Sequence, residues 1–177
     1  MKYSDVFNKL NSMKDKRTLF DETAAMLADF GFTVVQQDTD RPWGGFFVID
    51  DTQSLQFAAK YFAGENIDEL KITEKLSPKI LMVAPQMRLS WQYHHRRAEI
   101  WKCIAGIVGV ITSDTDEERK QHILKPGDII KLKQGERHRL IGLNDCGIVA
   151  EIWQHTDAGN PSDENDIVRL QDDFSRR

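Results

Sequence analysis

Four side chains with metal-binding chemistry recur at a defined spacing in the second half of the chain. Gln92, His94 and Glu99 lie within eight residues, and His138 follows about forty residues later, behind a Gly-x-x-His turn. Because side chains alternate along a strand, Gln92 and His94 should point to the same side. Amide, imidazole and carboxylate donors together suit a borderline divalent cation. The spacing therefore predicts a metal site with Gln92, His94, Glu99 and His138 as ligands and Zn²⁺ as the first choice, with Mn²⁺, Fe²⁺ or Ni²⁺ as alternatives.

The remaining histidines have simpler interpretations. An isolated histidine on a strand is more often a core or surface residue than a ligand, and this holds for His122 and His155. His95 follows a predicted ligand directly, so alternation turns it to the opposite face of the strand. Gln92 is the weakest of the four predicted ligands, and the alternative is that its amide hydrogen-bonds the substrate beside a cation with three ligands.

The elements that must position these ligands are short strands. Residues 79–155 contain apolar runs of four to seven residues separated by Pro85, Gly106, Pro126 and Gly135. The expected strands are 80–84, 89–94, 100–105, 109–113, 121–124, 128–132, 138–142 and 148–153. Short strands at this spacing are typical of a sandwich or a barrel. The fold class predicted is therefore mainly β.

The rest of the chain is expected to decorate this barrel. Residues 1–38 show apolar positions at helical spacing and predict an N-terminal helical extension that ends at Gly31. Residues 39–78 form a connecting segment with a strand at 45–49, a helix near 55–62 and a charged turn through 68–75. Residues 156–177 form a polar tail that we expect to end in a short helix. At 177 residues, the chain is expected to be a single domain.

Composition excludes several function classes. The net charge of −4 provides no basic field for nucleic acid. No apolar run approaches the roughly 20 residues that span a bilayer, and the polar N-terminus does not resemble a signal peptide. Cys103 and Cys146 lie in apolar surroundings, which predicts free thiols in a reducing compartment. The expected location is cytoplasmic, without a nucleic-acid or membrane partner.

A longer run around the predicted ligands resembles a known family. Residues 89–101 read Leu-Ser-Trp-Gln-Tyr-His-His-Arg-Arg-Ala-Glu-Ile-Trp. This run is similar to the motif of type II mannose-6-phosphate isomerases, which are cupins and often form the C-terminal part of bifunctional guanylyltransferase/isomerase enzymes. Three further segments match in order, namely Arg-Pro-Trp-Gly at 41–44, Gly-Glu-Arg-His-Arg-Leu at 135–140, and Asp-Ile-Val-Arg at 166–169 with Asp-Asp-Phe at 172–174. The resemblance implies a cupin-type double-stranded β-helix, or jelly-roll barrel, a divalent metal and interconversion of mannose 6-phosphate with fructose 6-phosphate. It also makes a homodimer the expected assembly.

The chain departs from this family at defined positions. Arg96 stands where the family has a third consecutive histidine, Gln86 replaces a glycine that opens the first motif, and Lys133 replaces a proline. Residues 51–78 resemble an insertion. These changes spare the predicted metal ligands but leave the substrate open to another phosphorylated aldose.

The expected reaction assigns roles to further residues. Aldose–ketose isomerisation moves a proton between C1 and C2 through an enediolate, so a base must reach the substrate carbon. Glu151, Lys79 and Glu136 are the candidates for proton transfer, and the sequence does not choose among them. The candidates for the catalytic and substrate-binding contacts are Arg169 in the tail motif, then Arg41, Arg96, Arg139 and Ser90, because guanidinium groups bind phosphate in a bidentate manner.

Three interpretations of single side chains can be checked against a structure. Arg96 shares the parity of His94, which predicts that it faces the barrel interior. Arg88 and Arg97 are interpreted as solvated surface charges or as salt-bridge partners of acidic residues. The four tryptophans are interpreted as a mixture of sugar-pocket walls and packing residues.

Two alternative functions stay open. One is a different cupin reaction, such as epimerisation or oxygenation. The other is a non-catalytic sugar-binding or sensing cupin, which the substitutions at Arg96 and Gln86 favour. A regulator would normally carry a DNA-binding element, and the N-terminal segment lacks a net basic face.

Overall fold

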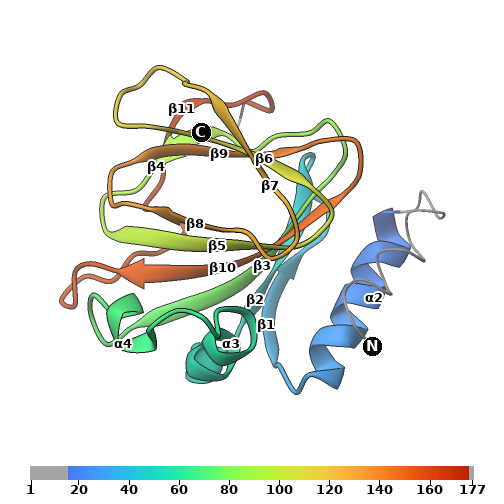
Figure 1. Cartoon of the computed structure of the whole chain (residues 1–177), viewed down its shortest axis with the longest axis vertical. Helices are drawn as coiled ribbons and strands as arrows, with labels where there is room; N and C mark the ends of the chain where they lie inside the picture. The colour runs from blue at the N-terminus through green and yellow to red at the C-terminus, as the bar shows by residue number, and fades with distance from the viewer. Residues whose placement is uncertain (1–15, 176–177) are drawn as a thin grey trace.

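Two antiparallel sheets face each other in the computed structural model, which describes residues 16–175 (Figure 1). The six-stranded sheet has the order β1 (Val34–Asp38), β2 (Gly44–Ile49), β3 (Leu76–Val83), β10 (Gly147–His155), β5 (Arg97–Ala105) and β8 (Ile129–Leu132). The five-stranded sheet has the order β11 (Val168–Gln171), β4 (Trp91–Tyr93), β9 (Arg137–Gly142), β6 (Val108–Ser113) and β7 (Gln121–Leu124). This arrangement confirms the mainly β fold and is that of a jelly-roll barrel.

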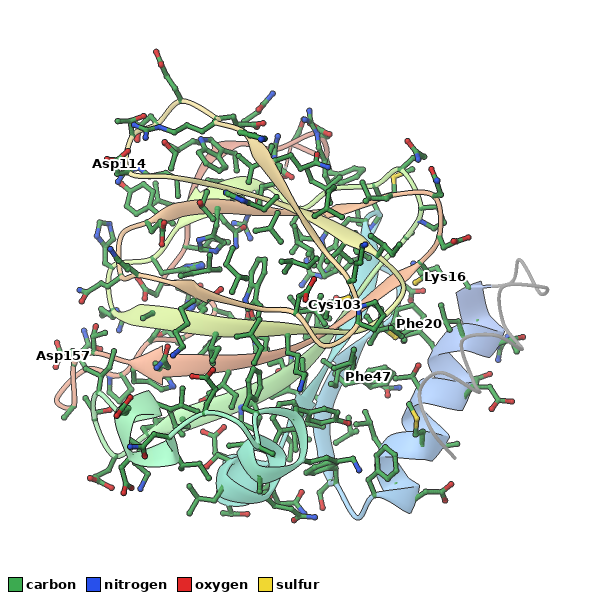
Figure 2. All side chains as sticks on the ribbon, viewed as in Figure 1. Lys16, Phe20, Phe47, Cys103, Asp114 and Asp157 are labelled. Carbon is green, nitrogen blue, oxygen red and sulfur yellow. The ribbon has the colours of Figure 1, made fainter. Side chains whose placement is uncertain are left out.

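Alternation along the central strands produces two apolar cores. On β10, Ile148 and Ile152 point outward to the helices, whereas Val149 points inward between the sheets. The outer core is completed by α2 (Lys16–Asp29), α3 (Ser54–Tyr61) and α4 (Ile67–Leu70), and a 3₁₀ turn covers Asp51–Gln53. Figure 2 shows Phe20 of α2 turned towards Phe47 of β2, and their ring centroids lie 5.7 Å apart. The six-stranded sheet is therefore buried on both faces.

The predicted helices form where their apolar faces meet this sheet. In α3, Phe57, Ala58 and Tyr61 recur with helical spacing and are buried, as expected for residues 55–62. Helix α2 ends as predicted at Gly31, which has φ +77°, while the N–H of Phe32 donates to the Leu27 carbonyl. Both α3 and α4 belong to the segment that resembles an insertion, and they lie on the outside of the six-stranded sheet (Figure 1).

The glycine of the Arg-Pro-Trp-Gly segment allows two strands to approach each other closely. Gly44 has φ +145°, and a Cβ atom at this position would lie 1.9 Å from the Met82 carbonyl oxygen. Only glycine can fill such a position. The close contact holds Arg41 and Trp43 at the end of β2, beside β3.

Two predicted boundaries are wrong. Residues 34–38 of the expected helical extension form β1, because Val34 and its neighbours pair with β2. The expected C-terminal helix is replaced by β11, which pairs with β4, with Arg169 opposite Gln92. The barrel therefore includes β1, β2 and β11 as well as the expected 79–155 core. The apolar positions before Lys16 lie outside the described residues.

The described residues contain no helix that is both long enough and apolar enough to cross a membrane. Both cysteines are free thiols, as the sequence predicted.

Candidate active site

Three of the four predicted ligands converge between the sheets. His94 follows β4, Glu99 lies on β5 and His138 lies on β9, and all three are buried. Glu99 Oε1 is 3.2 Å from His94 Nε2, and Glu99 Oε2 is 3.4 Å from His138 Nε2. Ligand atoms from the three residues lie within 4.8 Å of one another. Donors from both sheets therefore meet at one point.

The orientation of both histidines fits a cation at this point. His94 Nδ1 donates to the Asp166 carbonyl at 2.6 Å, and His138 Nδ1 donates to the Glu136 carbonyl at 2.9 Å. A carbonyl can only accept, so each Nδ1 carries a proton, and Nε2 is the nitrogen of each ring that can present a lone pair to the centre. Burial lowers the pKa of His94 to about 3, which keeps this ring neutral. His138 Nε2 is buried without a hydrogen-bond partner among the described residues, as expected of an atom placed to bind a cation.

Gln92 lies beside this cluster and completes the donor set. It pairs with His138 across β4 and β9, and its Nε2 is 3.5 Å from His94 Nε2. Its Oε1 accepts a hydrogen bond from Ser90 Oγ at 2.5 Å. A half-turn of the amide exchanges Oε1 and Nε2, and the Ser90 hydroxyl can serve either arrangement. The four residues therefore fit a divalent cation, with Gln92 as the adaptable member.

Arg97 is part of this cluster. It forms a salt bridge with Glu99, one of the two predicted alternatives, but the salt bridge is buried, so the interpretation as a surface charge is wrong. Its side chain is 5% exposed, and Nε donates to Glu99 Oε1 at 2.7 Å. Nη2 lies 3.1 Å from His94 Nε2, and the guanidinium stacks 3.6 Å above the Trp153 ring. Arg97 and Glu99 share a face of β5 because they are two residues apart. The same alternation in the sequence could have identified Arg97.

A pocket opens beside the cluster and contains most of the predicted site residues. Its lining includes Arg41, Lys79, Ser90, Gln92, Glu99, Glu151 and Arg169. Strand register explains their proximity, because Glu151 on β10 pairs with Lys79 on β3 and with Trp101 on β5. Trp43, Trp101 and Trp153 also line the pocket, whereas Trp91 is buried and donates to the Asp116 carbonyl.

Glu151 is a buried carboxyl group inside this pocket. Burial and the charge of Glu99 raise the pKa of Glu151 to about 8, although Lys79, Arg97 and Trp101 oppose the shift. The Trp101 indole N–H lies 2.9 Å from Glu151 Oε1 and 3.1 Å from Glu99 Oε2. Glu151 is thus held next to the ligand cluster in a largely protonated form at neutral pH.

Lys79 lines the same pocket. Its ammonium forms an ion pair with Glu164 and lies 3.5 Å above the Trp153 ring. The Lys79 side chain is only 6% exposed, whereas that of Glu164 is 59% exposed. The carboxylate of Glu164 therefore covers the buried Lys79 ammonium on the solvent side of the pocket.

Three predicted site residues lie outside both the pocket and the ligand cluster. Arg96 donates to Asn160 Oδ1 and to the Pro161 carbonyl, because the chain bends after His94 and ends the strand alternation. Arg139 is buried and binds Glu118 and the Gln171 carbonyl, so it anchors β11. The Glu136 carboxylate accepts the Lys133 N–H in the β8–β9 turn. Glu136 contributes to the site through its main-chain carbonyl, which orients His138.

Asp166 is a site-forming residue that we did not assign from the sequence. Besides its carbonyl bond to His94, its carboxylate accepts the main-chain N–H groups of His95 and Arg96 at 2.9 Å each. Ser162 Oγ donates to the same carboxylate at 2.6 Å. The Asp-Ile-Val-Arg motif contained this signal, since its aspartate precedes Arg169 by three residues. Asp166 connects the tail to the ligand segment.

Together, the two facing sheets and the His–Glu–His cluster define a cupin. Residues 61–172 match the family model described as mannose-6-phosphate isomerase C-terminal, and the chain belongs to this family. Family membership supports a sugar-related function. A comparison with curated protein sequences found no match.

Solved structures show the same fold at low sequence identity. Recombinant oxalate oxidase in complex with glycolate is 16% identical, with a TM-score of 0.52 over 80% of this chain and 64% of that chain. The capsular polysaccharide assembling protein CapF from Staphylococcus aureus is 13% identical, with a TM-score of 0.52 over 77% and 34% of the two chains. A cupin-superfamily sugar phosphate isomerase from Silicibacter pomeroyi is 13% identical, with a TM-score of 0.39 over 45% and 50%. This chain thus matches less than two thirds of each of these structures, and the likeness shows the fold alone.

Proposed function

We propose that this protein is a metal-dependent aldose–ketose isomerase acting on a sugar phosphate, with mannose 6-phosphate and fructose 6-phosphate as the leading pair. The convergence of His94, Glu99 and His138 beside a pocket that contains a second buried carboxyl group, Glu151, is the observation that carries this proposal. The family match agrees with it. Zn²⁺ is the leading cation, because the donors are imidazole, carboxylate and amide.

The protein side chains divide the chemistry between them. Gln92, His94, Glu99 and His138 hold the cation, which supplies positive charge to stabilise the enediolate oxygens. Glu151 moves the carbon-bound proton: its carboxylate form takes the proton from C2, and the resulting carboxylic acid returns it to C1. The hydroxyl proton on O2 passes to O1 within the enediolate, which leaves the carbonyl at C2. A pKa near 8 suits this task, because the group can both accept and donate a proton near neutral pH.

The phosphate is bound by cations elsewhere in the pocket. Arg41 lines it from the turn between β1 and β2, and Arg169 lines it from β11. Lys79 is a further cationic contact, and its partner Glu164 is exposed enough to move aside for a ligand. Ser90 lies within reach of a sugar hydroxyl through the same pocket.

Metal depletion and reloading, followed by a substrate panel, test this proposal. Protein stripped with chelator is reloaded with zinc, manganese or nickel and assayed with mannose 6-phosphate and with other aldose phosphates. Metal-dependent ketose formation is expected for at least one sugar phosphate. Glu151→Gln should lower kcat by at least about 100-fold, while Glu136→Gln, a matched change outside the pocket, should not.

The same experiment separates the isomerase from a sensing cupin. Tight binding of a sugar phosphate by metal-loaded protein, without turnover across the panel, would contradict the isomerase and favour a binding function. An active Glu151→Gln variant would leave the reaction class standing but would remove Glu151 as the proton carrier.

A further inference from the structure

We propose that Arg97 competes with the divalent cation for His94 and Glu99, and thereby sets the metal affinity of this site. This inference rests on the metal site of the proposed function. It assigns Arg97 a role that the identity of the ligands does not specify.

The competition follows from the number of lone pairs. His94 Nδ1 donates to the Asp166 carbonyl, so the neutral ring has a single acceptor, the in-plane lone pair on Nε2. Arg97 Nη2 lies 3.1 Å from this atom and can only donate to it. A cation coordinated by Nε2 needs the same lone pair. The hydrogen bond from Arg97 must therefore break when His94 becomes a ligand.

Glu99 is shared between the same two partners, although each carboxylate oxygen has two lone pairs and the choice is less strict than at His94. Its Oε1 accepts the Arg97 Nε–H at 2.7 Å and lies 3.2 Å from His94 Nε2. One edge of the guanidinium thus contacts two of the three clustered ligands at once. A buried cationic side chain bonded to a buried carboxylate forms strong hydrogen bonds, so a cation must share the charge of Glu99 with Arg97.

The opposite edge of the guanidinium is anchored independently of the ligands. Nη1 donates to Ser162 Oγ at 2.8 Å and lies 3.2 Å from the Asp163 carbonyl. The plane stacks on Trp153. These contacts can persist while the Nε and Nη2 edge turns away, so Arg97 can give up the ligands without leaving its site.

Charge alone would also weaken cation binding, so the test must separate charge from contact. Lys79 provides the control, because it is a buried cation lining the same pocket with no hydrogen bond to His94, Glu99 or His138 among the contacts of the described residues. Lys79→Met removes one positive charge, as Arg97→Met does. Arg97→Lys retains the charge but cannot contact both ligands through a planar fork.

Co²⁺ binding to chelator-treated protein is the measurement, followed by visible absorption and by competition with a chromophoric chelator. We expect Arg97→Met to bind Co²⁺ roughly tenfold or more tightly than the unmodified protein. Arg97→Lys should also bind more tightly, and Lys79→Met should change the affinity by a clearly smaller factor. In the chelator-treated state Arg97→Met should melt at a lower temperature, and added Co²⁺ should restore more of its Tm than it adds to the unmodified protein.

Each contrary result has a separate meaning. Equal or weaker Co²⁺ binding by both Arg97 variants would overturn the competition and make Arg97 a support for Glu99 as a ligand. Equal gains in Co²⁺ affinity for Arg97→Met and Lys79→Met, with no gain for Arg97→Lys, would show that only the lost charge matters. That result would also overturn the proposed competition. If neither the unmodified protein nor any Arg97 variant bound Co²⁺, the proposed metal site itself would fail. If Arg97→Met did not fold, Arg97→Lys against Lys79→Met would decide.

Discussion

Two main-chain carbonyl groups determine what His94 and His138 can do. Each carbonyl accepts the Nδ1–H of one ring, so the side of the imidazole that faces the cluster is a lone pair. Without a cation, Nε2 of His138 would face the Glu99 carboxylate without a hydrogen-bond partner among the described residues, whereas Nε2 of His94 accepts a hydrogen bond from Arg97. Ligation is therefore the interpretation that satisfies these buried atoms, and both carbonyls come from segments that the family motifs contain.

Glu151 should make folding stability depend on pH. Its folded pKa of about 8 lies above that of an exposed glutamate, so the folded state holds a proton that the unfolded chain has already released. The contribution of Glu151 to the free energy of unfolding is fully present below its pKa in the unfolded chain. It is lost as the pH rises through its pKa in the folded protein. Urea unfolding of chelator-treated protein should show stability falling between about pH 5 and pH 8 from this group, and Glu151→Gln should flatten the decline.

Glu136→Gln is the control for this pH dependence, because its carboxylate lies outside the pocket. A decline of equal slope in Glu151→Gln and in the unmodified protein would show that Glu151 is not the group responsible.

The sequence identified single residues well where strand alternation continued and poorly where it stopped. Gln92 and His94 lie side by side as period-two spacing predicted, and Glu99 and His138 meet His94 as their motif positions predicted. Arg96 does not lie where alternation predicted, because the bend after His94 turns it towards the 160–163 loop. No local pattern in the sequence shows where a strand bends.

At the scale of elements, the left-handed turn at Gln86 explains one departure from the family. Gln86 has φ +61°, a conformation that glycine adopts without strain and other residues adopt at a cost of about 1 kcal/mol. The Gln86 side chain offsets part of this cost by donating to the Leu143 carbonyl at 2.9 Å. The family glycine therefore reflects backbone geometry at the start of the β3–β4 connection, not substrate chemistry.

A pair of variants isolates this strain. Gln86→Ala and Gln86→Gly both remove the side-chain hydrogen bond, but only glycine relieves the backbone. Gln86→Gly should be more stable than Gln86→Ala by about 1 kcal/mol in urea unfolding, the reverse of the usual order of the two residues. Equal stability would indicate that the turn adopts another conformation in solution.

The conformation of the loop of residues 156–167 depends on hydrogen bonds to Asp166. Its buried carboxylate accepts two main-chain N–H groups and the Ser162 hydroxyl. Asp166→Ala should lower the free energy of unfolding by about 3 kcal/mol, because it leaves these donors without an acceptor. Asp166→Asn, which keeps one oxygen acceptor, should lose less.

The Asp166 variants also have a readout at the site. The Asp166 carbonyl orients His94, so both variants should weaken cation binding in the same order as they lose stability. Unchanged cation affinity in a destabilised Asp166→Ala protein would show that His94 is held by other contacts.

The tail shows why some elements escape prediction. Residues 164–177 place apolar side chains at spacings that a helix would use, yet residues 168–171 pair with β4. Pairing with the edge of β4 favours a strand over a helix here. Arg139 and Arg88 also hold the tail in place, because they bind Gln171 and Asp173. Those partners are distant in sequence, so local periodicity could not reveal them.

At the scale of the whole molecule, the sequence predicted the barrel but not its edge strands. Short alternating strands at 79–155 predicted the two facing sheets, and the family motifs predicted where the ligands meet. The edge strands β1 and β11 were missed, since each is a short segment that becomes a strand only through a neighbour. The same two edges carry Arg169 and border Arg41, so the missing strands are those that complete the pocket.

Charge is also distributed unevenly over the molecule. The chain carries a net charge of −4, yet Arg41, Lys79, Arg97 and Arg169 all line one pocket. Glu99 and Glu164 line the same pocket and balance part of this charge, whereas Glu151 is largely protonated near neutral pH and offsets little of it. A cationic pocket within an acidic protein suits a small anionic ligand and agrees with the proposed sugar phosphate.

Metal content after equilibrium dialysis against Zn²⁺ tests the central claim most directly. The account predicts about one ion per chain in the unmodified protein and in His122→Ala, whose side chain is an exposed histidine on β7. In His138→Ala the content should fall well below one, because one of the converging donors is lost. Full occupancy in His138→Ala, or no stoichiometric metal in the unmodified protein, would contradict a cation held by His94, Glu99 and His138.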